Sequence, residues 1–579
     1  MPLPVYLETF GCQMNELDSE LVTSQLRTLG YRFTPDADAA QVVLFNTCSV
    51  RELAEQKVWS RLGELAIRKV RQPALVVGVL GCMAEREGEA LLKRMPVVDI
   101  LVGPGELDKL PGLLDNAVRT RLSLAHDAPV VPAELEQIPT ALKKSLVSAG
   151  QSALQGNTTR RSSTLAAAAD SLEMLDLSRA TAPEDHHGSA YVRITRGCNK
   201  FCTYCVVPYT RGAEVHRPPE HILDECKRLA DAGVIEITLL GQTVNHYRFE
   251  HASAVSINGI VQPQKGRIYK ANEELADAYA GERVTTFADL LKRIHDEVPA
   301  IKRLRFVTSY PRSFGNDVLQ VIRESPRICR YLHVPAQSGS NRMLQAMNRG
   351  YTVEQYLEFL DRARQFLHQP EINRPLTLAG DIIVGFPGET EEDHEATKTL
   401  LRKARYKNCF IFKYSPRPGT TAYDKLADDV PDEVKRRRNN ELLALQQQIS
   451  DEVGKEIIGR TLQVFVQGIS KRQAKVKSRA AGSGKVALTI GGRSAEMAGD
   501  HAPEQGGACS VNGSHITTEI AGDENGRNQP EIAQFEARTD GDLIVHFDAP
   551  AAESDHLVGS IIDISIQSVN GLSLTGRRA

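Results

Sequence analysis

The chain has 579 residues, 41% hydrophobic and 25% charged, which predicts a globular protein of about three domains. Its formal net charge of -3 does not indicate a nucleic-acid binder, so a basic patch for such a partner has to be local. No apolar run reaches the roughly 18 residues of a membrane span, and the opening stretch MPLPVYLETFGCQMNE lacks the apolar core of a leader, so we expect a cytoplasmic protein. Ten cysteines are too few for a disulfide scaffold and indicate metal or redox chemistry.

The first 120 residues alternate apolar runs with helical patterns. The runs VYLETF, VVLFNTC and ALVVGVLGC read as strands, and helices are expected from about Asp18 to Gly30, through Ala54 and Leu65, and from Glu85. This alternation predicts a doubly wound parallel sheet. Residues 121–187, rich in Ala, Ser, Thr and charge, read as a linker or insertion.

Alternation resumes over residues 188–450. Six strands separated by helices (AYVRIT, EITLLG, RLRFVTS, YLHVPA, LAGDIIVGF and CFIFKYS) predict an open sheet or an incomplete (β/α) barrel. A polar insertion interrupts them between Tyr247 and Thr286, and a charged helix from about Asp432 to Val453 follows. Residues 455–575 read as a small β-domain broken by an acidic, Gly-rich stretch.

Three cysteines, Cys198, Cys202 and Cys205, stand in CxxxCxxC order after the first of these strands. Three thiolates can hold a 4Fe–4S cluster and leave one iron open to a chelating molecule such as S-adenosylmethionine (SAM). Structural zinc is the alternative, but zinc prefers four ligands and no fourth cysteine follows.

Cys12, Cys48 and Cys82 each follow a predicted parallel strand, in the stretches FGC, NTC and LGC. The carboxyl ends of parallel strands converge on one edge, where ligands bind. We therefore expect a second iron–sulfur cluster there, although a single buried cysteine is more often a small apolar residue.

The motif TRGCNKFCTYCVVPYTRG, with GCQMNELDSE, NTCSVRELAEQKV, GCMAEREGE, VPAQSGSNRMLQAMNRGYT and DIIVGFPGETEED, resembles the MiaB-type tRNA methylthiotransferases, a family of radical SAM enzymes. The resemblance implies a radical SAM barrel and a C-terminal TRAM-like β-barrel that grips RNA. It implies that the first trio holds the SAM-cleaving cluster and that Cys12, Cys48 and Cys82 hold an auxiliary cluster that delivers sulfur. The implied reaction adds a methylthio group to C2 of isopentenyladenosine beside the anticodon and consumes two SAM.

The resemblance implies a further SAM contact at Tyr204, between two of the cysteines, and more contacts are expected near the strand ends at Gln242, Ser309, Gly385 and Glu389. Each of the four residues near the strand ends is also compatible with a structural role in a loop. The expected RNA-contacting cations are Arg460, the Arg436–Arg438 run, Lys471, Arg472, Lys475 and Lys477.

Three alternatives stay open: a ribosomal-protein aspartate as substrate, threonylcarbamoyl-adenosine in tRNA as substrate, or an iron–sulfur protein that binds RNA without catalysis. The expected partners are tRNA, SAM and a flavodoxin-type electron donor, and the protein is expected to be a monomer.

Overall fold

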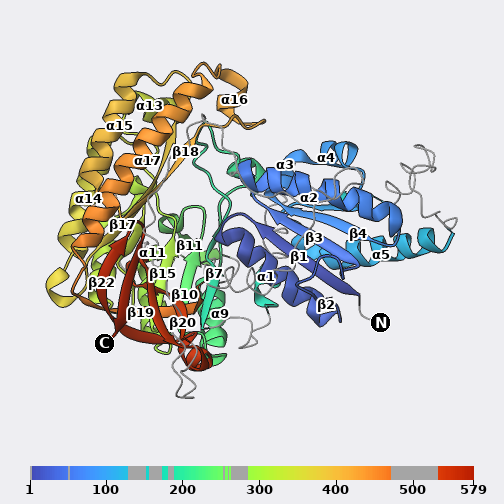
Figure 1. Cartoon of the computed structure of the whole chain (residues 1–579), viewed down its shortest axis with the longest axis horizontal. Coiled ribbons are helices and arrows are strands. Elements are labelled where there is room, and N and C mark those ends of the chain that lie inside the picture. The colour runs from blue at the N-terminus through green and yellow to red at the C-terminus, as the bar shows by residue number, and fades with distance from the viewer. Residues whose placement is uncertain are drawn as a thin grey trace, which may run out of the picture.

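The computed structural model describes residues 3–49, 52–127, 151–154, 173–179, 188–251, 255–257, 260–262, 284–470 and 532–579. A blue N-terminal α/β unit, a green-to-orange central unit and a red C-terminal barrel follow one another along the chain (Figure 1). This order confirms the predicted fold class. None of the helices in these ranges has both the length and the apolar character that crossing a bilayer requires.

The N-terminal unit is a six-stranded parallel sheet in the order β2-β1-β3-β4-β5-β6. Helices cover both faces, which is why β3 and β4 are buried along their whole length. The strands are β1 (Pro4–Phe10), β2 (Arg32–Phe33), β3 (Val42–Thr47), β4 (Val76–Gly81), β5 (Ile100–Val102) and β6 (Ser152–Leu154). One face carries α1 (Gln13–Thr28) and α5 (Leu110–Asp127), and the other carries α2 (Glu52–Arg71), α3 (Cys82–Glu87) and α4 (Glu89–Arg94).

Two features of this unit differ from the sequence expectations. Helix α1 begins at Gln13 and α3 at Cys82, both earlier than expected, so Cys12 is the residue that caps α1 and Cys82 opens α3. The predicted linker also contributes to the fold, because residues 152–154 form β6 and residues 173–179 bring Leu175 into the core. Segments this short carry no periodicity that a sequence pattern could reveal.

The central unit is an incomplete barrel of six parallel strands in two halves, as predicted. The first half is β15-β10-β7 and the second is β16-β17-β18. The halves meet where the Ser309 N–H donates to the His333 carbonyl at 3.0 Å. The strands are β7 (Ser189–Arg193), β10 (Glu236–Leu240), β15 (Arg303–Val307), β16 (Tyr331–His333), β17 (Thr377–Val384) and β18 (Asn408–Lys413).

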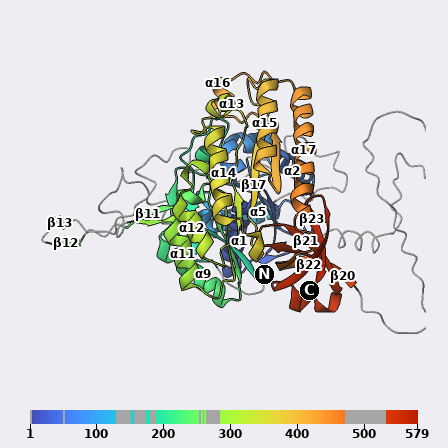
Figure 2. The ribbon, with the colours of Figure 1, turned by 90° about the vertical axis from the view of Figure 1, so that its left-hand side faces the viewer.

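Helices form the outer layer of this barrel (Figure 2). They are α9 (Pro219–Asp231), α11 (Phe287–Glu297), α12 (Asn316–Glu324), α14 (Val353–Leu367), α15 (Glu391–Ala404) and α17 (Asp432–Lys455). The short helices α13 (Asn341–Ala346) and α16 (Thr421–Lys425) lie at the carboxyl end of the strands. The insertion after Tyr247 is based on β11 (Arg248–Glu250) paired with β14 (Val284–Thr286), and it includes the hairpin β12 (Val255–Ile257) and β13 (Ile260–Gln262).

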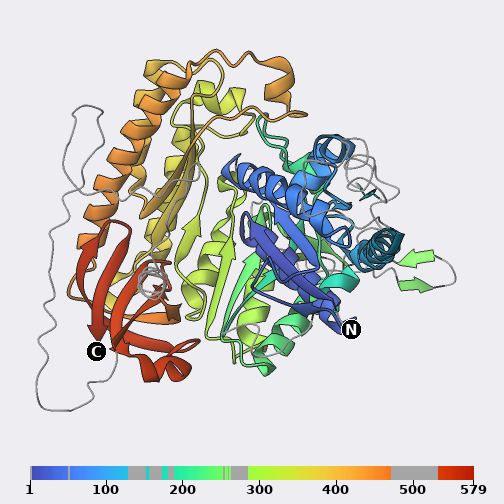
Figure 3. The same ribbon diagram turned by 45° about the vertical axis from the view of Figure 1, so that its right-hand side comes forward.

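The C-terminal unit is a closed barrel in the order β19-β20-β21-β23-β22, at the foot of α17 (Figure 3). Its strands are β19 (Thr461–Ile469), β20 (Ile532–Thr539), β21 (Ile544–Pro550), β22 (Ile561–Asn570) and β23 (Ser573–Arg578), with α19 (Ser554–Leu557) between β21 and β22.

This barrel docks on the amino ends of the central strands. Arg303 donates to the carbonyls of Arg538 (2.7 Å) and Gln463 (2.6 Å), and the Lys407 ammonium lies 2.8 Å from the Asp542 carboxylate. The cysteine loop lies at the opposite, carboxyl ends of the central strands, which this barrel does not cover.

Candidate active site

The CxxxCxxC motif lies in a loop closed by the two-stranded pairing of β8 (Thr195–Arg196) and β9 (Val215–His216). The Cys198 N–H donates to the Gly212 carbonyl at 3.1 Å. Gly197 has φ +69°, and a Cβ there would lie 2.1 Å from the Ala213 carbonyl oxygen. Only glycine lets the two ends of the loop approach this closely.

The middle of this loop is fixed to the second half of the barrel. Thr203 donates from its N–H to the Met347 carbonyl (3.1 Å) and from its hydroxyl to the Ala346 carbonyl (2.9 Å). The Ala422 N–H donates back to the Thr203 carbonyl at 2.8 Å. The loop that starts from the first half-barrel is therefore held by the second.

Burial opposes ionisation of two of these thiols, Cys198 and Cys205. Burial and the neighbouring Cys202 raise the pKa of Cys205 to about 12, and burial raises that of Cys198. Such a group of thiols fits a metal cluster, because bound iron favours the thiolate form that burial disfavours.

A buried arginine supplies positive charge to this trio. The Arg349 guanidinium donates to the Cys202 Sγ at 3.3 Å, the Tyr204 hydroxyl at 3.4 Å and the Pro335 carbonyl at 3.0 Å. Burial alone lowers the pKa of Arg349, but Tyr351, Tyr204 and Cys202 raise it above its usual range. The guanidinium is therefore charged beside the thiols.

Cys12, Cys48 and Cys82 gather at the carboxyl edge of the N-terminal sheet, as predicted. The chain reverses its strand order between β1 and β3, so Cys12 and Cys48 flank the switch point where such sheets bind ligands. A hydrogen bond with Cys48 lowers the pKa of Cys12 to about 6, and burial raises that of Cys82. The lowered pKa of Cys12 favours the thiolate, the form that binds metal.

The surroundings of Cys48 fit an iron–sulfur cluster. The neighbouring hydroxyls of Thr47 and Ser49 are buried and have no hydrogen-bond partner among the described residues. Cluster sulfurs accept hydrogen bonds that tune their potential, so these hydroxyls are suitable donors. Within the described ranges, no three His, Cys, Asp or Glu side chains are arranged around a position for one metal ion. A cube does not need that arrangement, because each thiolate binds a different iron.

A buried chain of ion pairs joins the N-terminal unit to the central unit. Arg211 follows the Cys198–Cys205 loop, and its guanidinium contacts the Asp18 carboxylate of α1 at 2.9 Å. Asp18 also pairs with Arg193 of β7 at 2.8 Å, and Arg193 pairs with Asp176 at 2.6 Å. The charge of Arg211 favours the thiolate forms of Cys12 and Cys82. One residue of the first loop therefore acts electrostatically on the second trio.

Two of the five expected SAM contacts carry unsatisfied polar atoms. Gln242 follows β10 and Ser309 follows β15, both at the carboxyl end of the barrel. The Gln242 Oε1 and the Ser309 Oγ are buried without a partner in the described part of the chain. Because such atoms cost free energy unless a ligand satisfies them, both suit a bound molecule. Tyr204 is partly buried and packs its ring edge-on against Phe386, with centroids 6.4 Å apart.

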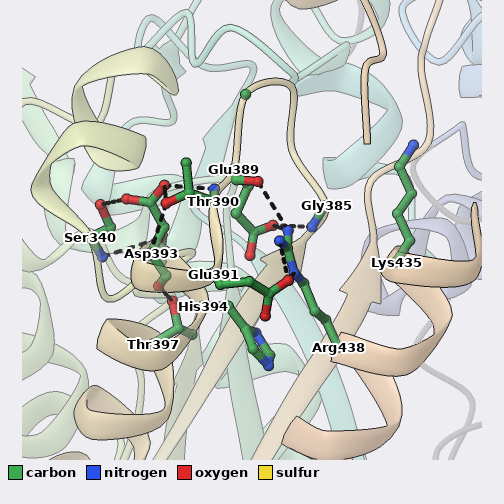
Figure 4. A network of polar contacts seen from close by, with 12 residues as sticks. Ser340, Gly385, Glu389, Thr390, Glu391, Asp393, His394, Thr397, Lys435 and Arg438 are labelled. Carbon is green, nitrogen blue, oxygen red and sulfur yellow. Dashed lines mark hydrogen bonds and ion pairs between the residues drawn. The ribbon is translucent and has the colours of Figure 1, made fainter. Parts of the chain in front are cut away.

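Gly385 and Glu389 contact each other (Figure 4). The Glu389 carboxylate accepts the Gly385 N–H and lies 3.6 Å from the Arg438 guanidinium. Burial raises the pKa of Glu389 to about 7. These contacts stabilise the turn that presents Phe386 to Tyr204.

The sequence patterns give no sign of a role for Arg349 and Arg211, although both lie inside motifs of the family, NRGYT and PYTRG. Of the expected RNA-contacting cations, Arg438 is buried and paired with Glu391 at 2.7 Å, and Arg460 donates to the Pro370 carbonyl at 3.1 Å. Lys471, Arg472, Lys475 and Lys477 lie outside the described residues.

Two family models match the chain: Uncharacterized protein family UPF0004 over residues 4–103 and Radical SAM superfamily over residues 192–401. A Rhodopirellula baltica protein named tRNA-2-methylthio-N(6)-dimethylallyladenosine synthase is 41% identical, covering 82% of this chain and 86% of that one. A Homo sapiens mitochondrial tRNA methylthiotransferase is 38% identical, covering 81% of this chain and 72% of that one. Among solved structures, the radical SAM methyltransferase TsrM of Kitasatospora setae matches with TM-score 0.41 and 15% identity over 73% of this chain and 77% of that one.

The matched families cover the segments that carry the two thiol trios, and the relatives extend over most of the chain. The chain therefore belongs to the MiaB-type branch of the radical SAM methylthiotransferases.

Proposed function

We propose that this protein adds a methylthio group to C2 of N6-dimethylallyladenosine (isopentenyladenosine) beside the anticodon of tRNA. One observation carries the proposal: two separate trios of thiols lie at the carboxyl ends of two parallel sheets, and the charge of Arg211, from the loop of the first trio, favours the thiolates of Cys12 and Cys82 in the second. The relatives named as synthases of this modification support the choice of substrate.

As a radical SAM enzyme, the protein uses SAM and 4Fe–4S clusters, which supply radical, methyl and sulfur chemistry when bound. In the proposal Cys198, Cys202 and Cys205 hold the cluster that binds SAM, and Cys12, Cys48 and Cys82 hold the auxiliary cluster.

The remaining side chains of the site orient SAM and place positive charge beside the thiolates. Gln242 and Ser309 offer hydrogen bonds to SAM through their unpartnered oxygens, and Tyr204 contributes to the wall beside it. Arg349 and Arg211 each place a fixed positive charge beside one trio. In the proposal the C-terminal barrel grips the RNA, and the protein acts as a cytoplasmic monomer fed by a flavodoxin-type electron donor.

Cysteine variants test the division of labour between the trios. Anaerobically reconstituted Cys198→Ala protein is expected to release no deoxyadenosine from SAM. Cys48→Ala protein is expected to keep part of that release and to form no methylthio product on tRNA. Identical behaviour of the two variants would contradict the assignment.

A nucleoside profile tests the substrate. A strain lacking this protein is expected to contain dimethylallyladenosine without its methylthio form, and restoring the gene is expected to bring the latter back. An unchanged nucleoside profile would contradict the proposal. A change in threonylcarbamoyl-adenosine or in a ribosomal-protein aspartate would select one of the two other substrates, and an absence of deoxyadenosine release would indicate a non-catalytic iron–sulfur protein.

A further inference from the structure

The second half of the barrel exposes two phenylalanines on its inner face. Pairing in register places Phe410 beside Asp381 and Phe412 beside Ile383. The alternate residues of β17, such as Ile382 and Val384, are buried against the outer helices, so Phe410 and Phe412 project to the opposite side.

Both rings are unusually accessible for aromatic side chains on a barrel strand. Phe410 is 43% exposed and Phe412 is 41% exposed, and their rings stack at 15° with centroids 6.4 Å apart. The corresponding inner face of the first half is covered: Tyr191, Leu240 and Val307 pack into the core around α1. The second half of the barrel therefore has an exposed apolar surface on its inner face, and such a surface is typical of a binding site.

A polar group borders this aromatic pair. The His333 ring lies edge-on to Phe410 with centroids 6.4 Å apart. Its Nδ1 is 2.8 Å from the Thr308 hydroxyl and its Nε2 is 3.0 Å from the Asp381 carboxylate. A flat apolar wall that ends in a fixed imidazole matches a heteroaromatic base that carries an apolar substituent.

The same strands lead to both thiol trios. Beyond β17, Phe386 meets Tyr204 in the CxxxCxxC loop. Beyond β18, the Arg417 guanidinium lies 3.1 Å from the Glu55 carboxylate of α2, the helix that follows Cys48. A base held on this face is therefore within the part of the barrel that both trios border.

We propose that Phe410 and Phe412 form the subsite by which the enzyme selects an adenosine with an apolar N6 substituent over an unmodified one. The inference rests on the proposed function and specifies its substrate discrimination. The stacked rings bury the alkenyl group, and the His333–Asp381 pair borders the polar edge of the base.

The test measures binding of two anticodon stem-loop RNAs, one with dimethylallyladenosine and one with adenosine at the target position. Fluorescence anisotropy with anaerobic holoenzyme is expected to show that the wild type prefers the dimethylallyl RNA. The Phe410→Ala/Phe412→Ala variant is expected to bind that RNA about tenfold more weakly and the unmodified RNA unchanged, because only the former loses apolar burial. A Phe410→Leu/Phe412→Leu variant is expected to retain an intermediate preference.

Ile67→Ala is the matched control, since Ile67 is also a large exposed apolar residue (62%) but lies on the outer helix α2. A double alanine variant that keeps the wild-type preference, or that loses both RNAs equally, overturns the inference. A wild-type protein that shows no preference and forms no methylthio product would instead overturn the proposed function.

Discussion

The two halves of the central barrel have the same βα construction and different surroundings. The inner face of β15-β10-β7 is covered by α1 and crossed by the buried Asp18–Arg193 pair. The inner face of β16-β17-β18 carries Phe410 and Phe412 in the open. The difference shows how one barrel can devote half of its interior to holding a second domain and leave the inner face of the other half uncovered.

The largest expected effect comes from breaking the covered half. Asp18→Asn removes a carboxylate that pairs with both Arg193 and Arg211 and leaves buried positive charge without compensation. We expect the free energy of unfolding to fall by about 3–5 kcal/mol, measured by urea denaturation of anaerobic holoenzyme.

Asp115→Asn is the control for this change. Asp115 pairs with Arg119 at 3.0 Å on the exposed surface, where such pairs contribute less than about 1 kcal/mol. Equal unfolding free energies for the two variants would show that the covered half does not depend on the ion pairs.

A smaller loss of unfolding free energy is expected where the C-terminal barrel docks on the amino ends of the central strands. Asp542→Asn leaves the buried Lys407 ammonium without its carboxylate and is expected to cost about 3 kcal/mol. Burial lowers the pKa of Lys407 to about 8, and Lys407 lowers that of Asp542 to about 2 against the effect of burial. The folded state therefore binds fewer protons at Lys407 than the unfolded state between pH 8 and the ordinary lysine value, and its contribution to stability rises with pH there.

Removal of Asp542 lowers the Lys407 pKa further, so the variant is expected to gain more stability than the wild type on going from pH 7 to pH 9. Thermal unfolding at the two pH values measures the difference. Glu553→Gln, at an exposed pair with Arg578, is expected to behave as the wild type. A parallel pH response in all three proteins would contradict the assignment.

The next prediction concerns the rate at which Cys12, at the start of α1, reacts with an alkylating reagent. In metal-free protein, Cys12 is expected to react with iodoacetamide first at neutral pH, because its pKa is about 6 and the thiolate is the nucleophile. Its rate is expected to fall about tenfold per pH unit below that value. Peptide mapping identifies the modified residue, and Cys12→Ser is expected to lose the fast phase. A fast phase at Cys205, whose pKa is about 12, would reverse the interpretation.

The smallest effect on stability is expected from Ser309→Ala, at the junction of the two half-barrels. The Ser309 hydroxyl has no partner among the described residues, so Ser309→Ala is expected to leave the stability of SAM-free protein unchanged or raise it by about 1 kcal/mol. The Kd for SAM, measured by equilibrium dialysis, is expected to rise by up to about tenfold. A destabilised variant with unchanged SAM binding would assign Ser309 to the fold alone.

Much of this arrangement was predictable from local patterns. The strand-end positions of Cys12, Cys48 and Cys82 followed from apolar runs that each end in a cysteine. Because the carboxyl ends of parallel strands converge, the three cysteines were expected at one edge of the sheet. The CxxxCxxC loop was evident from spacing alone.

The differences between the half-barrels were not predictable in this way. CFIFKYS and EITLLG look alike as strands, and only the docking of α1 decides which inner face is covered. Arg211 and Arg349 act on cysteines through contacts distant in sequence, so no local pattern indicated their roles. The strand at 152–154 was missed because three residues form it only by pairing with β5.

The docking of the C-terminal barrel has a consequence for how its sequence can vary. Arg303 and Arg305 donate to main-chain carbonyls of Arg538, Gln463, Thr539 and Asp540, which every residue type presents. Substitutions at these four positions are therefore expected to leave the contacts in place, provided the backbone path is kept, whereas the attachment at Asp542 depends on its side chain. A C-terminal barrel fixed in this manner is free to diversify its outer surface while its seat stays the same.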